Sequence, residues 1–152
     1  MRYSQIIDFD VNNGDGIRVS LWTQGCEFKC RGCHNPHTWS KSGGKRFDEE
    51  SEAYLFSLMD KDIEKNLSIL GGEPLAPYNR IGTIQLCKNF KKKFPHKTIW
   101  LWTGYTIEEI QDTMSELLLY VDVLIDGQYI ESLKDENLMW RGSSNQRIHK
   151  LR

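Results

Sequence analysis

The chain alternates between short apolar runs and longer segments whose apolar residues recur at helical spacing. Short apolar runs bounded by turn residues are typical of buried strands, and they occur at 17–23, 67–70, 98–102 and 121–125. A further strand is predicted near 147–150. Helical spacing predicts helices between these strands, at 49–59, 79–94 and 106–120.

Within these predicted elements, individual residues can be assigned to the core or to a helix start. One apolar stripe along the middle helix is predicted from Ile81, Ile84, Cys87 and Phe90. Cys87 is therefore expected to be a core thiol rather than a ligand. Thr106 followed by Glu109 has the capping-box pattern and marks the start of the last helix. Trp100 and Trp102 share one face of a strand and are expected in the core.

Strands that alternate with helices predict right-handed βα units and a mostly parallel sheet. The 152 residues suffice for one domain, 1–152, with about four or five such units, too few for a closed eight-stranded barrel. The predicted fold class is therefore α/β, an incomplete (βα) TIM-like barrel with one open side. Its strand-end loops, at 25–36, 71–74, 103–105 and 126–127, should gather at the carboxyl edge, where such folds bind ligands.

Composition and charge narrow the class of protein. Apolar residues make up 39% of the chain and charged residues 27%, as in ordinary globular domains. A formal charge of -1 gives no overall basic field for nucleic acid or an anionic membrane. No apolar run could span a bilayer, and the first residues lack the apolar core of a signal peptide. We therefore expect a cytoplasmic protein whose cysteines are ligands or reactive thiols rather than parts of structural disulfides.

Three cysteines dominate the candidate chemistry. Cys26, Cys30 and Cys33 follow the first predicted strand with the spacing C-x3-C-x2-C. Three thiolates leave one iron of a four-iron cluster without a protein ligand, and an open position is where metal chemistry occurs. The alternatives are a zinc site completed by His34 or His37, and a redox pair of Cys30 and Cys33. Structural zinc sites usually draw on two separated pairs of ligands, and only one group is present here.

The sequence Gly-Gly-Glu-Pro follows the next predicted strand. The backbone at Gly71 and Gly72 can approach a ligand closely, and free carbonyls there can accept a hydrogen bond from an ammonium group. Glu73 can place charge near such an ammonium or can stabilise the turn. The plain alternative is a turn that simply ends the strand.

Together these two motifs resemble those of the radical S-adenosylmethionine (SAM) superfamily. Within it the chain resembles the anaerobic ribonucleoside-triphosphate reductase-activating proteins. The similar stretches follow the family order over nearly the whole chain, at 13–18, 25–39, 71–75, 100–105, 122–127 and 140–147. Two positions depart from the common pattern: Gly32 stands where the wider superfamily usually has an aromatic residue, and Asp15 stands where relatives often have proline.

The resemblance implies a radical SAM core and a mechanism. Cys26, Cys30 and Cys33 would hold a [4Fe-4S] cluster whose open iron binds the amino and carboxylate groups of SAM. One electron would cleave SAM into methionine and a 5′-deoxyadenosyl radical, which removes a hydrogen atom from a glycine of the reductase large subunit. A donor such as flavodoxin would supply the electron.

The resemblance also implies which residues would contact SAM. Candidates are Gly32, Cys33, His34, Gly71, Gly72, Glu73, Thr103 and Asp126. Thr103 and Asp126 follow later strands and could meet the ribose or the methionine part, or could be ordinary turn and cap residues. His34 could equally be a surface-loop histidine. The polar tail 141–147 could border the site and touch the reductase, or could close the edge of the sheet.

Three rival functions stay open from the sequence. One is activation of another glycyl-radical enzyme of the formate-lyase type, although the tail favours the reductase branch. Another is a zinc-binding interaction module, which would not need the Gly-Gly-Glu-Pro loop. The third is a ferredoxin-like electron carrier, which would be expected to use four protein ligands.

Overall fold

A mixed β-sheet forms the frame of the molecule in the computed structural model, which describes residues 1–59 and 63–152. Its seven strands lie in the order β3-β1-β2-β4-β5-β6-β7. In chain order they are β1 (Arg2–Asp10), β2 (Arg18–Thr23), β3 (Lys45–Arg46), β4 (Asn66–Gly71), β5 (Ile99–Trp102), β6 (Val123–Asp126) and β7 (Arg147–Lys150).

The centre of the sheet is parallel. β2, β4, β5 and β6 pair in parallel, whereas β1, β3 and β7 add antiparallel edges. The crossovers contain α1 (Glu49–Ser57), α2 (Arg80–Lys93) and α3 (Ile107–Thr113). This confirms the α/β class and a mostly parallel sheet that does not close. The described residues contain three helical crossovers, so the expectation of four or five βα units was too high.

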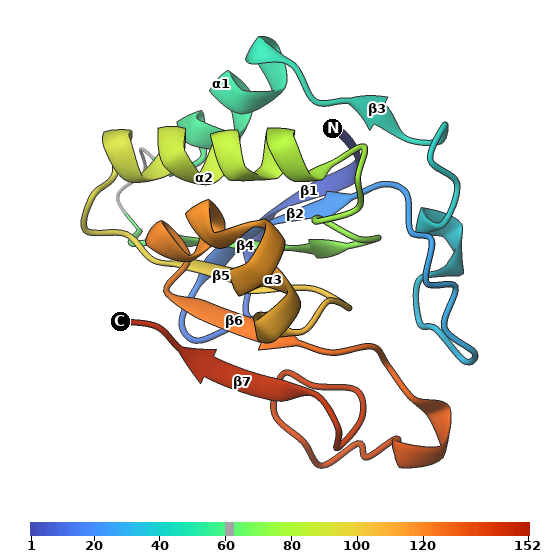
Figure 1. Ribbon diagram of the computed structural model, residues 1–152. Helices are drawn as coiled ribbons and strands as arrows, with labels where there is room; N and C mark the ends of the chain where they lie inside the picture. Colours follow the sequence, from blue (N-terminus) through green and yellow to red (C-terminus); the bar gives the residue numbers. More distant parts are fainter. Residues whose placement is uncertain (60–62) are drawn as a thin grey trace.

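All three α-helices lie on one face of the sheet, as Figure 1 shows. Side chains alternate between faces along a strand, and those facing the helices form the main core: Val19, Leu21, Leu67, Ile69, Ile99, Leu101 and Leu124. Within α2, Cys87 and Phe90 are fully buried, as predicted, but Ile81 is 80% exposed. The buried stripe of α2 also contains Thr83 and Leu86. Steps of three residues fall short of a full turn by about 60° each, so Ile81 lies on the side of the helix opposite Phe90.

The opposite face of the sheet carries no helix among the described residues. A second apolar cluster lies there, in which Trp100 packs edge-on against Trp140 with ring centroids 4.6 Å apart. Trp100 is buried, as predicted, whereas Trp102 stays partly exposed. Loops rather than helices cover this face: Ser68 Oγ donates to the Asn13 carbonyl at 2.6 Å, and Trp140 packs over Trp100, so that Val123 and Ile125 are buried.

Three elements differ from the sequence prediction. β3 was not predicted, because its two residues are charged and carry no apolar pattern. β1 was not predicted, because its residues alternate imperfectly and its register against β2 shifts twice, between Tyr3 and Gln5 and between Ile7 and Asp10. The predicted helix 106–120 ends at Thr113, where Met114 leaves the helical conformation with φ of -144°. A 3-10 helix, Ser115–Leu119, follows and places Leu117 in the core.

The parallel strands bring their carboxyl ends to one edge of the sheet. There the loop after β2 contains a short 3-10 helix, Pro36–Thr38, and the segment between β6 and β7 contains another, Glu131–Leu133. The final predicted strand, Arg147–Lys150, is present with the predicted bounds. None of the helices in the described parts of the chain has the length and apolar character needed to cross a membrane.

Candidate metal centre

A pocket lies at the carboxyl edge, between the loops that follow β2, β4, β5 and β6. Its empty volume is about 890 Å³, including the part open to solvent. Eight of the ten predicted site residues line it: Cys26, Cys30, Cys33, His34, Gly71, Gly72, Glu73 and Thr103. Gly32 and Asp126 do not. Loops from four strands thus meet at one site, as the parallel topology predicted.

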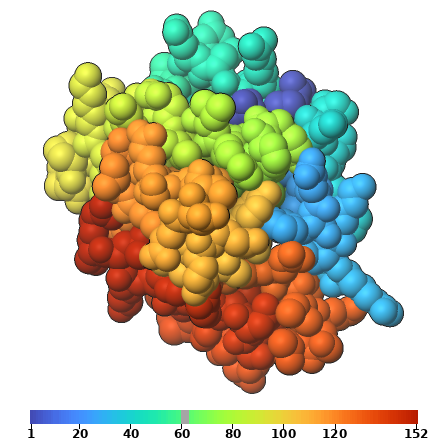
Figure 2. Space-filling view, in the orientation of Figure 1, coloured from blue at the N-terminus to red at the C-terminus, as the bar shows by residue number. Residues whose placement is uncertain are grey.

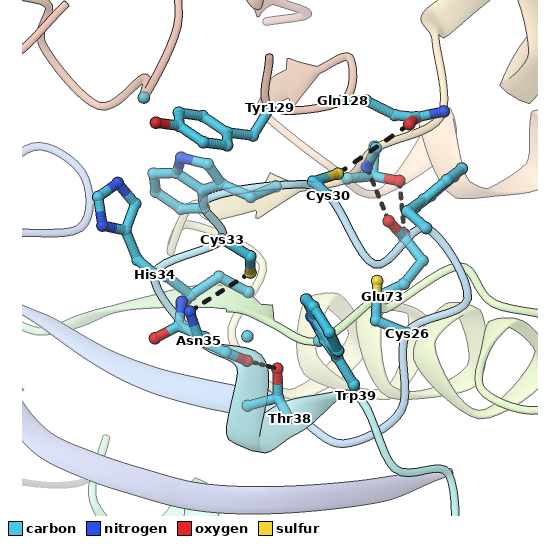
Figure 3. A pocket seen from close by; sticks show the side chains of 18 of the residues that line it. Cys26, Cys30, Cys33, His34, Asn35, Thr38, Trp39, Glu73, Gln128 and Tyr129 are labelled. Atoms are coloured by element: carbon cyan, nitrogen blue, oxygen red, sulfur yellow. Dashed lines mark hydrogen bonds between the residues drawn. The ribbon is translucent and has the colours of Figure 1, made fainter. Parts of the chain in front are cut away.

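The three thiols lie around one space in Figure 3. The backbone N–H of Asn35 donates to Sγ of Cys33 at 3.3 Å. Burial raises the pKa of Cys26, while the amides of Phe28 and Lys29 act against it. Burial likewise raises the pKa of Cys30, which the Tyr129 amide opposes. Amide donors around each sulfur suit thiolates bound to a cluster, since such bonds stabilise the negative sulfur.

The spacing of the thiols bears on the kind of metal centre. Among the described residues, no group of three or more His, Cys, Asp or Glu side chains is close enough to hold a single metal ion. A four-iron cluster binds each thiolate through a different iron, so its ligands stand farther apart than those of one ion. The donor set of three free cysteines in one pocket fits such a cluster.

The cysteine loop is held by its backbone at both ends. Gly25, with φ of 101°, donates its N–H to the Thr38 carbonyl, and Cys26 donates to Trp39. Between the cysteines, Lys29 has φ of 47°, a left-handed conformation that costs a non-glycine residue energy. The loop therefore stores backbone strain next to the thiols.

The Gly-Gly-Glu-Pro loop packs directly against the start of the cysteine loop. A Cβ atom at Gly72 would lie 2.6 Å from the Gly25 carbonyl oxygen, so a side chain does not fit there. The Gly72 N–H donates to Thr23, and the Glu73 N–H donates to Gly25. The glycine is thus required by contact between the two loops, whatever ligand enters the pocket.

The Glu73 carboxylate ties the loops after β4 and β5 together. It accepts hydrogen bonds from Leu75 N at 2.9 Å, Thr103 Oγ1 at 2.6 Å and Gly104 N at 2.7 Å. The residue is 2% exposed, and burial raises the pKa of its carboxyl to about 7 against the effect of these bonds. Of the two roles considered for Glu73, these contacts are those of a residue that stabilises the turn.

Several residues that line the pocket were not predicted from the sequence. The Phe28 ring, between two of the cysteines, packs against Gly104 and lies 5.0 Å from the Tyr105 ring. Gln128 and Tyr129 come from the segment after β6, and the Tyr129 ring lies 5.5 Å from the His34 ring. An aromatic residue inside the cysteine motif was a signal for Phe28. No pattern marks residues that reach the pocket from so far along the chain.

The polar tail borders the pocket through Gly142 and Gln146. The Gln146 side chain accepts from the Gly142 and Ser143 amides and donates to the Gly127 carbonyl at 2.9 Å. One side chain thus fastens both ends of the segment that carries Gln128 and Tyr129.

Asp126 lies outside the pocket and fastens β6 to its neighbours. Its carboxylate accepts from Arg147 Nη2 at 2.6 Å and from Ile107 N at 2.7 Å. It also lies 3.2 Å from His149 Nε2. Burial on its own would raise the pKa of Asp126, but the bonds from Arg147 and Ile107 and the charge of His149 outweigh it and lower the pKa.

Asp126→Asn is expected to destabilise the fold by about 2 kcal/mol at neutral pH, because it removes charge-assisted hydrogen bonds from a buried site. A carboxylate with a lowered pKa stabilises the fold above its unfolded pKa and loses that effect as pH falls through the folded one. The difference between wild type and variant should therefore shrink below about pH 4. Urea unfolding at several pH values measures it; a difference independent of pH would contradict this account.

The chain that forms this site is similar to proteins of a known family. A family model described as a 4Fe-4S single cluster domain matches residues 12–149. The anaerobic ribonucleoside-triphosphate reductase-activating protein of Vibrio cholerae is 45% identical over 99% of both chains. The proteins of that name from Escherichia coli and Enterobacteria phage T4 are 38% and 44% identical, over 100% and 97% of this chain and 100% and 93% of their own lengths.

The chain belongs to this family of anaerobic ribonucleoside-triphosphate reductase-activating proteins. In this member of the family the matched range includes every predicted site residue and all four cysteines. Cys87 is buried in the core on α2, so Cys26, Cys30 and Cys33 are the thiols that this member of the family presents in its pocket.

Proposed function

We propose that this protein activates an anaerobic ribonucleoside-triphosphate reductase by installing a glycyl radical on it, with a [4Fe-4S] cluster and SAM. The observation that carries this proposal is the meeting of three thiols and the Gly71–Gly72 backbone in one pocket at the carboxyl edge. The chain would act as a single radical SAM domain, 1–152, in the cytoplasm, with an electron donor such as flavodoxin.

Cys26, Cys30 and Cys33 would hold the cluster. When bound, the reduced cluster supplies the electron that splits SAM into methionine and a 5′-deoxyadenosyl radical, which takes a hydrogen atom from a glycine of the reductase. The protein's own part is to position these groups and to keep water out. The hydrogen bonds that join the 71–73 backbone to β2 and Gly25 hold the cysteine loop in place for this task.

The other predicted residues form two groups: those proposed to contact SAM and those that hold the pocket loops in position. The Gly71 and Gly72 backbone and the ring of His34 line the pocket and are proposed to contact SAM, as is the backbone at Cys33. The hydroxyl of Thr103 already donates to Glu73 and accepts from Tyr105 N, so Thr103 and Glu73 position the site.

A protein substrate suits the shape of the molecule. The pocket is partly open to solvent, and Trp102, which lines it, stays partly exposed, so a loop of the reductase could enter on this side. Partly exposed apolar side chains beside a reactive site suit contact with a protein partner. The same geometry would serve a glycyl-radical enzyme of the formate-lyase type, but the family assignment favours the reductase.

The proposal is tested by anaerobic purification, reconstitution with iron and sulfide, and reduction in the presence of SAM. We expect a brown protein that releases methionine and 5′-deoxyadenosine, and a glycyl-radical EPR signal when the reductase is added. A colourless protein with one tight zinc would overturn the proposal. A signal with a formate lyase in place of the reductase would assign the chain to the rival activase.

A further inference from the structure

Trp39 has a buried indole N–H that lacks an acceptor. Its Nε1 atom is buried and has no hydrogen-bond partner among residues 1–59 and 63–152. The side chain lines the same pocket as the three cysteines and is drawn with them in Figure 3. Leaving a buried donor unpaired costs free energy, so native proteins seldom keep one unless a water, an ion or a ligand accepts the bond. The N–H of Trp39 therefore indicates an acceptor that the chain itself does not supply.

The other tryptophan of the pocket is different. Trp102 donates its Nε1–H to the carbonyl of Trp140 at 2.8 Å. Outside the pocket, Trp22 likewise donates to Ser20 Oγ at 3.0 Å. The pocket thus contains one indole N–H that the fold already uses and one that it leaves available. Trp102 is therefore an internal reference for Trp39.

A tight turn fixes Trp39 relative to two of the cysteines. The 3-10 helix Pro36–Thr38 ends at Trp39. The carbonyl of Trp39 accepts a hydrogen bond from the Cys26 N–H at 3.1 Å. At the other end of the turn, the Asn35 N–H donates to Sγ of Cys33 at 3.3 Å. The segment that carries the unpaired N–H is therefore bonded to two of the proposed ligands.

The turn is also held by residues on either side of it. Gln24 Nε2 donates to the carbonyls of His37 and Ser40, at 3.2 Å and 2.8 Å. The Thr38 hydroxyl donates to the Asn35 carbonyl at 2.7 Å. The cysteine loop reaches the surface, light blue on the right of Figure 2, but Thr38 is only 1% exposed. These bonds keep the backbone at Trp39 in one position, which a preorganised donor requires.

We propose that Trp39 donates its indole N–H to a sulfur atom of the [4Fe-4S] cluster and thereby raises the reduction potential of that cluster. This rests on the proposed function, in which Cys26, Cys30 and Cys33 hold the cluster. Cluster and thiolate sulfurs carry negative charge and accept hydrogen bonds, so they supply the missing acceptor. Reduction adds one more negative charge, and a hydrogen bond stabilises the more negative form. The indole N–H therefore favours the reduced cluster.

The bonds of the turn favour the cluster over SAM as the acceptor. They connect the turn to Cys26 and Cys33 themselves, whereas the Gly71–Gly72 backbone, proposed to contact SAM, lies at the end of β4. A donor to the cluster acts whether or not SAM is bound, and a donor to SAM acts only in its presence. The potential measured without SAM therefore distinguishes the two acceptors.

The test uses the full-length protein after anaerobic reconstitution. Trp39→Phe removes the N–H and shortens the ring, and a second variant with benzothienylalanine at position 39 keeps a bicyclic ring and lacks only the N–H. Trp102→Phe is the matched control, because the N–H that it removes already has an acceptor in the fold. The midpoint potential of the cluster is measured without SAM by redox titration followed by EPR. The affinity for SAM is measured separately by calorimetry.

We expect both variants at position 39 to lower the equilibrium constant for one-electron reduction about tenfold, which corresponds to a midpoint potential about 59 mV lower. Trp102→Phe should change it far less. Equal potentials in wild type and both position-39 variants, as for an N–H bonded to water, would overturn the proposal. A shift in Trp39→Phe alone, or an equal shift in the control, would assign the effect to ring packing and overturn it as well.

Two further outcomes concern SAM. An unchanged potential together with weaker SAM binding in the position-39 variants would overturn the proposal in favour of SAM as the acceptor. A wild-type cluster that is reduced normally but does not cleave SAM would instead count against the proposed function alone, because the potential is measured without SAM.

Discussion

Cys30→Ala is expected to abolish both the cluster and SAM cleavage. Two thiolates would remain in the pocket, and the lost ligand lies between the amide of Tyr129 and the side chain of Gln128. Iron and sulfide content, the visible absorbance of the reconstituted protein, and release of 5′-deoxyadenosine measure the effect. All three should fall to the background of protein without added iron.

Cys87→Ala is the matched control, since it removes a thiol of the same kind from the core. It should retain the cluster and SAM cleavage and lose only packing, about 1 kcal/mol of stability. SAM cleavage that survives in Cys30→Ala would show that the ligand set is wrong.

Glu73→Ala is expected to cost about 3 kcal/mol of stability, because it leaves three donors without their acceptor in a buried site. The loops after β4 and β5 should separate, and the cysteine loop packed against them should lose order. Anaerobic urea unfolding measures the stability, and the yield of reconstituted cluster measures the order of the site.

Glu109→Ala is the control for Glu73. Its carboxylate also accepts a backbone bond, from Thr106 N at 2.7 Å, but it is exposed, so water replaces the lost partner. A loss in Glu73→Ala no larger than in this control would contradict the role of burial.

The pH dependence of Glu73 has the opposite sign to that of Asp126. Its pKa of about 7 in the fold lies above the usual 4.5, so unfolding releases a proton between these values. Rising pH should therefore reduce the stability of wild type relative to Glu73→Gln, which does not titrate. If wild type instead gained stability relative to Glu73→Gln from pH 4.5 to 7, the hydrogen bonds to the carboxylate would outweigh the effect of burial on its pKa.

Local patterns determined most of the elements and the chemical class of the site. The parallel strands and their helices follow from short apolar runs and helical spacing, because each depends on neighbouring residues. The cysteine spacing and the glycine pair predicted where a cluster and its ligand would bind, since turn residues after parallel strands meet at one edge. β1 was not predicted because its residues alternate imperfectly, and its conformation depends on pairing with β2 and β3.

Tertiary structure alone decided the direction in which side chains point and which distant segments meet. Glu73 is a charged residue in a ligand-binding motif, yet its carboxylate turns inward, because Thr103 and Gly104 offer donors that only folding brings there. Gln128 and Tyr129 reach the thiols through the segment that Gln146 fastens. The sequence by itself therefore determined the fold class and predicted the candidate ligands, whereas the fold decided which predicted residues face the pocket and which support it. The physical reason is that a hydrogen bond between distant residues leaves no periodic trace in the chain.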